Sequence, residues 1–218
     1  MNEIAIFGAG GLGREVWLIL TKINQQKEKW KILGFFDDDL DLFSHNSNIP
    51  LKILGGMDQL NIFPRPLNLI IAVGNPLAMS TILGRINNCM ICYPNIISTD
   101  SLIYDDASFL GQGNIVASGC LFTDNVKVGN HNLFNYNTSF GHDVVIGDFN
   151  VFNPGTTISG NVTIGDKNLF GMNSSVVQGK KIGSHNKIGA CSLMLRNARD
   201  NESYFGVPAK KLDPRFNF

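Results

Sequence analysis

The chain has 218 residues, of which 44% are hydrophobic and 17% charged, which fits one or two globular domains. Its 18 basic and 18 acidic residues balance and form no block of like charge, so we expect no nucleic-acid partner. No basic segment precedes a long apolar segment near residue 1, and no apolar run approaches the roughly 18 residues of a membrane span. We therefore expect a cytoplasmic protein without membrane contact.

Cysteine usage indicates neither a disulfide framework nor a metal centre. Of the four cysteines, Cys89 and Cys92 form a CxxC pair. No second pair of ligands follows at the spacing of a zinc site, so we interpret them as ordinary thiols and predict no metal.

Residues 1 to about 90 alternate strand and helix signals. A short apolar strand over 4–7 runs into a glycine-rich turn. A helix pattern follows, whose apolar face carries Val16, Trp17, Leu20 and Ile23.

Two further strands are predicted by the apolar runs 32–36 and 69–73. After the second run, Asn75 can cap a helix that begins with Pro76. This order of elements predicts a small parallel α/β sheet of the Rossmann-like type.

The glycine turn GAGGLG matches the pattern G-x-G-x-x-G at Gly8, Gly10 and Gly13. Between a strand and a helix, its backbone amides can hold a pyrophosphate, although the same glycines can serve only tight strand–helix packing. Asp37 lies farther beyond Gly8 than the about 20 residues typical of NAD sites, and the domain is short. These features disfavour an NAD-linked oxidoreductase.

From about residue 97 the pattern changes to a period of six. Every sixth residue from Val128 to Met194 is apolar, and glycine often follows it. The same step runs through Ile97, Ile103, Phe109, Ile115 and Leu121, so one extra residue separates the two runs, and we expect a bulge or small loop near 122–127. A period of six is typical of a parallel β-helix, in which three hexads form a triangular coil around a stacked apolar core.

Within this array, His142 lies beside Asp143 in neither of the two hexad positions that face the core, so we expect it to project outward. His131 and His185 occupy another hexad position without an adjacent carboxylate, and His45 lies in a polar loop. A neutral imidazole can take a proton from a nucleophile, and a carboxylate can fix its tautomer. The residues alone leave open that His142 is a solvated turn histidine.

The hexad array, FGHDVVIGD at 140–148, ISGNVTIG at 158–165 and GVPAK at 206–210 resemble the hexapeptide-repeat acyltransferases. The N-terminal GAGGLGREV and GFFDD narrow the resemblance to the sialic acid O-acetyltransferase-like branch, which includes N-acetyltransferases of nucleotide-linked 4-amino-4,6-dideoxy sugars. The resemblance implies a left-handed β-helix, a homotrimer with active sites between adjacent β-helices, and acetyl-CoA as the donor.

The resemblance also implies roles for individual residues. His142 would be the general base and Asp143 its acidic partner, and the backbone N–H of Gly160 would bind the oxyanion across the subunit interface. Asn135 would lie near the sugar. The acetyl-CoA site would include Met172 and Ala190 along the pantetheine, and Lys210 at a CoA phosphate.

In the N-terminal domain, the resemblance implies a site for the nucleotide of the sugar substrate. The phosphates would lie against Gly10, Gly11 and Leu12, the base or ribose against Asp37 and Asp38, and the opposite wall would be Gly74. One position departs from the pattern, because Val151 stands where some N-acetylating relatives carry a second histidine, which leaves the acceptor subgroup open.

We therefore predict an α/β plus all-β chain: a Rossmann-like nucleotide-sugar-binding domain over 1–95, a left-handed β-helix acetyltransferase domain over 96–197 and a C-terminal tail over 198–218. The predicted reaction is direct acetyl transfer, without an acyl-enzyme, from acetyl-CoA to the 4-amino group of a nucleotide-linked amino-deoxy sugar in surface-glycan biosynthesis. The alternatives are O-acetylation of sialic acid or a related sugar, and a non-catalytic trimeric nucleotide-binding scaffold. The sugar, the nucleotide base and a strict preference for acetyl remain open.

Overall fold

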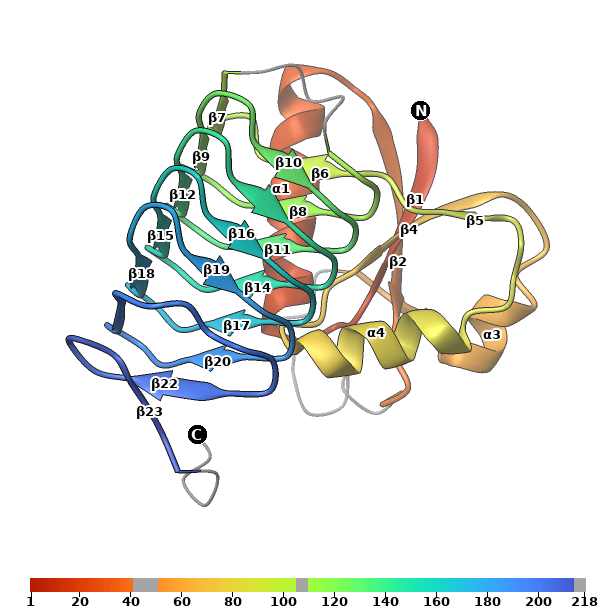
Figure 1. Ribbon diagram of the computed structural model, residues 1–218. Helices are drawn as coiled ribbons and strands as arrows, with labels where there is room; N and C mark the ends of the chain where they lie inside the picture. The colour runs from red at the N-terminus through yellow and green to blue at the C-terminus, as the bar shows by residue number, and fades with distance from the viewer. Residues whose placement is uncertain (41–50, 105–109, 214–218) are drawn as a thin grey trace.

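The computed structural model describes residues 1–40, 51–104 and 110–213, and Figure 1 shows an α/β domain beside a triangular β-helix. Sheet order in the first domain is β3-β2-β1-β4-β5, all parallel. The elements are β1 (Asn2–Phe7), α1 (Gly11–Gln26), β2 (Trp30–Phe36), β3 (Ile53–Gly55), α3 (Met57–Asn61), β4 (Leu67–Ile71), α4 (Pro76–Arg85) and β5 (Ile91–Cys92). The predicted α/β sheet is thereby confirmed.

The local signals of this domain act as expected. Helix α1 buries Val16 and Leu20, and α4 begins at Pro76. The Asn75 side chain accepts hydrogen bonds from two backbone amides of the first turn of α4, both at 3.0 Å. Strands β3 and β5 and helix α3 were not predicted, because such short elements cannot express a period.

The β-helix has three faces of short parallel strands. The eight-stranded face contains β6 (Ile96–Ile97), β8 (Ile115–Val116), β11 (Leu133–Phe134), β14 (Val151–Phe152), β17 (Leu169–Phe170), β20 (Lys187–Ile188), β22 (Ser203–Phe205) and β23 (Lys210–Lys211). The six-stranded face contains β7 (Leu102–Ile103), β9 (Leu121–Phe122), β12 (Ser139–Phe140), β15 (Thr157–Ile158), β18 (Ser175–Val176) and β21 (Leu193–Met194). The four-stranded face contains β10 (Lys127–Val128), β13 (Val145–Ile146), β16 (Thr163–Ile164) and β19 (Lys181–Ile182).

Stacked apolar side chains form the core of the β-helix. Each coil pairs in register with the equivalent residues of the next coil, as in Phe134↔Phe152 and Phe152↔Phe170. The ring centroids of these two pairs are 5.2 and 4.7 Å apart, close to the spacing of adjacent strands. The apolar residue of each hexad is thus buried directly above its equivalent in the previous coil.

The predicted position of the extra residue is wrong. The inward residues before Val128 are Val116 and Phe122, which continue its step of six, and not Ile115 and Leu121. Ile115 misled the count because it is apolar for another reason: it lies on the outer wall and is buried against the N-terminal domain.

Strand pairing places the extra residue earlier in the chain. Ile103 pairs with Phe122 and Leu110 pairs with Val128, and the first pair is separated by one residue more than the second. The insertion therefore falls between 103 and 110. Phe109 belongs to 105–109, which lie outside the described residues, as does His45.

From Gly113 to Cys191 a residue with positive φ occupies a corner of the β-helix at every sixth position, and Asn201 has the same conformation at a later corner. Glycine and asparagine adopt this left-handed conformation at the lowest cost, and they provide most of the set. The residues are Gly113, Gly119, Asn125, His131, Asn137, Asp143, Phe149, Gly155, Asn161, Lys167, Asn173, Gly179, His185, Cys191 and Asn201. Each turns the chain from one face to the next.

A ladder of buried asparagines runs inside one corner. Its members, each at most 1% exposed, are Asn114, Asn132, Asn150, Asn168 and Asn186. Each Oδ1 accepts a backbone N–H from the next coil, as in Asn150 N to Asn132 Oδ1 at 2.8 Å. The ladder ends where the Asn186 Oδ1 accepts the N–H of Glu202. Polar side chains thus satisfy backbone groups that the tight corner would otherwise leave unpaired.

The N-terminal domain covers the eight-stranded face. Outward side chains of that face, including Ile96, Leu133 and Val151, belong to the same apolar cluster as the α/β core. Helix α1 adds an ion pair across this contact, from Lys22 Nζ to Asp100 Oδ2 at 2.8 Å. Of the three outer walls, the six-stranded and four-stranded faces are therefore the two that the α/β domain does not cover (Figure 1).

The last strands end the coil stack differently. Strand β22 is parallel to β20, but β23 pairs with β22 in the antiparallel direction. Among the described helices, none has the length and apolarity needed to cross a membrane.

Core stacking gives a direct stability prediction. Phe152 is fully buried, with its ring stacked between Phe134 and Phe170. We expect Phe152→Ala to lower the free energy of unfolding by about 3–5 kcal/mol, because it removes stacked contacts and leaves a cavity. Urea unfolding followed by circular dichroism measures it, with Ile62→Ala, at a site 77% exposed, as the control expected to change little.

Candidate active site

His142 and Asp143 lie in the turn between β12 and β13. This corner joins the six-stranded and four-stranded faces, and we call it the His142 corner; its equivalent residues in successive coils are Asp124, His142, Gly160, Gln178 and Arg196. The His142 side chain is 53% exposed, so the predicted outward orientation is confirmed. His131, by contrast, is buried between aromatic rings, and burial lowers its pKa.

The two side chains form a hydrogen-bonded pair. Asp143 Oδ2 lies 2.8 Å from His142 Nδ1, and the positive φ of Asp143, 59°, turns its side chain back toward the preceding residue. The hydrogen bond with His142, followed by one from Asn125, lowers the pKa of the Asp143 carboxyl. An ionised carboxylate only accepts, so Nδ1 carries a proton in this pair, and in a neutral imidazole the lone pair then lies on Nε2.

Gly160 forms the floor beneath the imidazole. A Cβ atom at Gly160 would lie 2.6 Å from His142 Nε2 and 2.8 Å from Cε1, so only glycine leaves room for the ring in this position. Within the hydrogen bonds of the described residues, the Gly160 amide donates to no group. The structure thus brings His142 and Gly160 into contact within one chain.

Asn135, Met172 and Ala190 lie on a different corner. This corner joins the eight-stranded and six-stranded faces, and we call it the Met172 corner. Met172 and Ala190 line a groove of about 390 Å³ with Pro154, and Met172 is 51% exposed. A strand of the six-stranded face separates this corner from His142, so one chain alone does not bring these residues to the imidazole.

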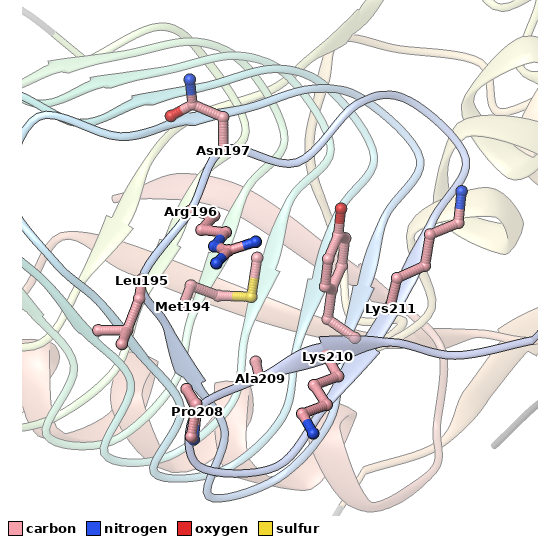
Figure 2. Close-up of a pocket in the computed structure, with 9 residues that line it drawn as sticks. Met194, Leu195, Arg196, Asn197, Pro208, Ala209, Lys210 and Lys211 are labelled. Carbon is pink, nitrogen blue, oxygen red and sulfur yellow. The ribbon is translucent and has the colours of Figure 1, made fainter.

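Lys210 lines a pocket of about 510 Å³ at the C-terminal end of the β-helix (Figure 2). Arg196 and Lys211 also line it, and Lys211 Nζ pairs with Glu202 at 2.7 Å. Arg196 belongs to the His142 corner three coils beyond His142, roughly 14 Å along the axis from the strand spacing. Of these cationic side chains, Arg196 therefore lies on the same edge as the histidine, whereas Lys210 and Lys211 belong to β23.

In the N-terminal domain, the glycines of the turn have two different roles. A Cβ at Gly8 would lie 2.7 Å from the carbonyl oxygen of Ala72, and one at Gly13 would collide with the carbonyl oxygen of Gly8. These two glycines serve tight packing between strands and helix. A Cβ at Gly10 or Gly11 would meet nothing within 4 Å, so the surface there is open to a ligand.

Asp37 and Gly74 follow the carboxyl ends of β2 and β4, on the same side of the sheet as this glycine turn. Asp37 Oδ2 accepts the backbone N–H of Ala9 at 2.7 Å, which ties the end of β2 to the glycine turn. Gly74 is exposed after β4, the neighbour of β1 on the other side. The chain reverses its direction of strand addition between β1 and β4, which is where open α/β sheets bind ligands. Leu12 packs partly against the core.

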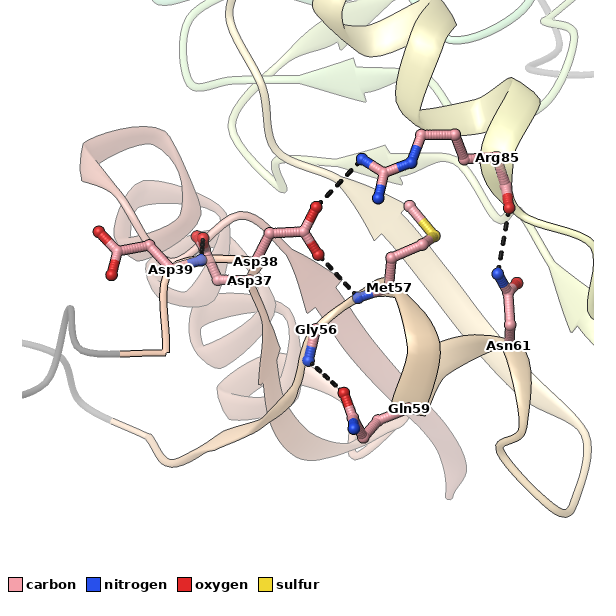
Figure 3. Close-up of polar contacts among 8 residues, drawn as sticks. All are labelled: Asp37, Asp38, Asp39, Gly56, Met57, Gln59, Asn61 and Arg85. Atoms are coloured by element: carbon pink, nitrogen blue, oxygen red, sulfur yellow. Dashed lines mark hydrogen bonds and ion pairs between the residues drawn. The ribbon is translucent and has the colours of Figure 1, made fainter.

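Asp38 faces the neighbouring pocket of about 320 Å³. Figure 3 shows its carboxylate between the Met57 N–H, at 2.8 Å, and Arg85 Nη1, at 3.1 Å. Both oxygens are thus engaged within the protein. Arg85 and Gln59 also line this pocket, and neither was predicted, because a polar residue on a helix carries no sequence signal for a pocket.

Two further residues of the His142 corner were missed. Asn125 donates to Asp143, and Arg196 lines the C-terminal pocket. Asn125 stands one coil before Asp143, and Arg196 stands three coils after His142, so the period could have identified both. Within residues 1–40, 51–104 and 110–213, no group of three His, Cys, Asp or Glu side chains could hold a metal.

Comparisons with known proteins agree with this architecture. Residues 3–86 match the family described as the PglD N-terminal domain. No curated protein sequence matches the chain. Among solved structures, a mutant of perosamine N-acetyltransferase from Caulobacter crescentus, in complex with CoA and GDP-perosamine, has a TM-score of 0.87 at 20% identity over 98% of both chains.

Two further solved structures are similar over the whole chain. The acetyltransferase domain of PglB from Neisseria gonorrhoeae, in complex with acetyl coenzyme A, has a TM-score of 0.86 at 24% identity, covering 97% of this chain and 100% of that one. WeeI from Acinetobacter baumannii has a TM-score of 0.82 at 24% identity with the same coverage. The predicted fold, a small Rossmann-like domain followed by a left-handed parallel β-helix, is confirmed.

The contact between Gly160 and His142 can be tested without any substrate. We expect the added methyl group of Gly160→Ala to displace the imidazole and break its hydrogen bond with Asp143. The displaced ring should turn into solvent, and the fold should persist. Because the ring is exposed and can move away, the free energy of unfolding should fall by less than the about 1–3 kcal/mol of a buried overpacked site. Imidazole ¹⁵N shifts of His142 report the lost pairing; unchanged shifts would contradict it.

Proposed function

We propose that the protein is an acetyl-CoA-dependent N-acetyltransferase acting on the 4-amino group of a nucleotide-linked amino-deoxy sugar, a reaction of surface-glycan biosynthesis in the cytoplasm. One observation carries the proposal: an exposed His142, hydrogen-bonded through Nδ1 to the Asp143 carboxylate, packs against Gly160, whose amide donates to no group within the described residues. A base and an oxyanion donor are the two groups that direct acyl transfer requires.

The chemistry follows from these two groups. The amine nitrogen attacks the thioester carbonyl carbon while His142 Nε2 takes the amine proton, and Asp143 stabilises the imidazolium that forms. The Gly160 N–H donates a hydrogen bond to the negatively charged carbonyl oxygen, after which the C–S bond breaks and CoA leaves as the thiolate. The Gly160 amide donates to no group within the described residues, so it is free to bind this oxygen. We place this donor in the same protomer as His142 rather than across an interface.

The acetyl-CoA site requires two protomers. Met172 and Ala190 line an open groove on one corner, whereas His142 lies on another corner of the same β-helix and the Lys210 pocket lies at its C-terminal end. Two chains in a homotrimer, with these corners facing each other, would supply both walls of the donor site. The α/β domain covers the eight-stranded face, which leaves the other two faces for subunit contacts.

The acceptor is assigned to the N-terminal domain, with Asn135 of the β-helix near the sugar. The carboxyl ends of the parallel strands bring together the unobstructed backbone of Gly10 and Gly11, the Asp37 carboxylate and the exposed Gly74. This arrangement suits a nucleoside diphosphate. The similar proteins support this, since one was solved with CoA and GDP-perosamine and another with acetyl coenzyme A. Val151 occupies the position of the second histidine that some relatives carry, so this chain has no equivalent of that histidine. The Val151 side chain is instead fully buried against the N-terminal domain.

O-acetylation of sialic acid or a related sugar is the second candidate, because the same base and donor serve a hydroxyl acceptor. A non-catalytic trimeric scaffold is the third, and the exposed, oriented imidazole disfavours it.

Product analysis tests the proposal. The protein is incubated with acetyl-CoA and a panel of UDP-, dTDP- and GDP-linked amino sugars, with sialic acid as the competing acceptor, and products are analysed by mass spectrometry. We expect a gain of one acetyl group on an amino sugar, retained after mild alkali that removes O-acetyl esters. Acetylation of sialic acid alone would favour the second candidate, and no product would favour the scaffold.

His142→Ala tests the role of the imidazole. We expect kcat to fall by about 100-fold or more, since a positioned base contributes 10²–10⁴-fold, while the trimer persists because the side chain projects outward. Turnover assays and light scattering measure the two properties, and normal turnover would exclude His142 as the base.

The glycine turn provides a matched pair of variants. A Cβ at Gly11 meets open space and the residue is exposed, so Gly11→Leu should leave the thermal midpoint of the free protein nearly unchanged while the rise caused by a nucleotide sugar is lost. Gly8→Ala should lower the midpoint of the free protein, because φ is 105° and the new methyl would meet the Ala72 carbonyl. If a nucleotide sugar still raises the thermal midpoint of Gly11→Leu normally, the nucleotide binds at another site.

A further inference from the structure

The carboxylate that orients His142 is itself held by a residue of the preceding coil. Asn125 Nδ2 donates to Asp143 Oδ1 at 2.7 Å, while Asp143 Oδ2 accepts from His142 Nδ1 at 2.8 Å. The three side chains form a continuous chain of hydrogen bonds, with one carboxylate oxygen assigned to each neighbour.

This arrangement depends on the register of the β-helix. Asn125 and Asp143 occupy the same position in successive coils, and both have positive φ, 54° and 59°. Stacked corners with the same backbone conformation project their side chains side by side. The amide of Asn125 therefore reaches the oxygen of Asp143 that points away from the imidazole.

Asp143 needs such a restraint because it is not buried. Its side chain is 45% exposed, and an exposed carboxylate exchanges its partners with water unless both oxygens are tied. The charge of nearby Lys127 also favours the ionised form but does not fix the plane of the carboxylate. A hydrogen bond to each oxygen does fix that plane, and with it the imidazole.

We propose that Asn125 is a positioning residue that acts through Asp143 to hold the His142 imidazole in the tautomer and orientation needed for proton transfer. The inference rests on the proposed acetyltransferase function for its effect on turnover, but not for its effect on the imidazole. Asn125 has no contact with the reacting groups in this assignment and contributes only through the carboxylate.

Two substitutions separate the hydrogen bond from the backbone conformation. Asn125→Gly removes the amide and keeps a residue that tolerates positive φ, and Asn125→Asp keeps the shape but replaces the donor with a like charge. Asn201→Gly is the matched control, since Asn201 has φ 59° on another corner, far from the dyad along the chain.

Imidazole ¹⁵N NMR provides a readout that needs no substrate. The chain has four histidines, so the His142 signals can be assigned by comparison with His142→Gln. We expect the wild type to hold the proton on Nδ1, and Asn125→Gly and Asn125→Asp to shift the ring toward tautomeric averaging. Asn201→Gly should leave the signals unchanged. Unchanged signals in both Asn125 variants overturn the proposal.

Steady-state kinetics test the catalytic consequence. We expect Asn125→Gly to lower kcat about five-fold, a loss typical of one exposed hydrogen bond to a charged group, with KM for both substrates within about two-fold of wild type. Asn125→Asp should lower kcat further. In an Asp143→Asn background, Asn125→Gly should cost less than about 1.5-fold, since its route to the imidazole is already broken.

The outcomes distinguish the inference from the function on which it rests. An equal kcat loss in both backgrounds, or unchanged kcat despite altered ¹⁵N signals, overturns the positioning role. A wild type that acetylates no sugar in the panel refutes the proposed function, and the NMR arm still decides whether Asn125 orients the dyad.

Discussion

A left-handed backbone conformation at the successive corners from residue 113 to residue 191 is the constraint on which this structure depends. The two-residue strands close into triangular coils because the chain turns sharply every six residues, and from Gly113 to Cys191 one residue with positive φ lies at each of these turns. Asparagine and glycine meet that demand at most corners. Asp143 is one of the exceptions, and the same conformation that turns the chain there directs its carboxylate back to His142.

Stacking then makes neighbours of residues that are one coil apart in the sequence, and the site is built from such pairs. His142 rests on Gly160 of the next coil, while Asp143 accepts from Asn125 of the previous one. No loop is needed to gather these groups. A rigid, repetitive wall therefore presents an oriented imidazole, at a place where the side chain remains open to a substrate.

Much of this was visible in the sequence, because periodicity is a property of the chain itself. The period of six located the β-helix and placed His142 outside its core. The register before Val128 failed, since Ile115 is apolar for its contact with the other domain, and no periodicity reports such a contact. Separating Gly8 and Gly13 from Gly10 and Gly11 required coordinates, because their different surroundings come from elements distant in sequence.

The terminal hairpin has a consequence for self-association. A stack of parallel strands ends in unpaired backbone groups that could template another copy and grow into a fibre. Here β23 runs against β22, and both of its residues, Lys210 and Lys211, are exposed lysines. The reversed direction and two exposed lysines, one of them paired with Glu202, make this rim a poor template for a further strand, so the last described strand closes this end of the solenoid.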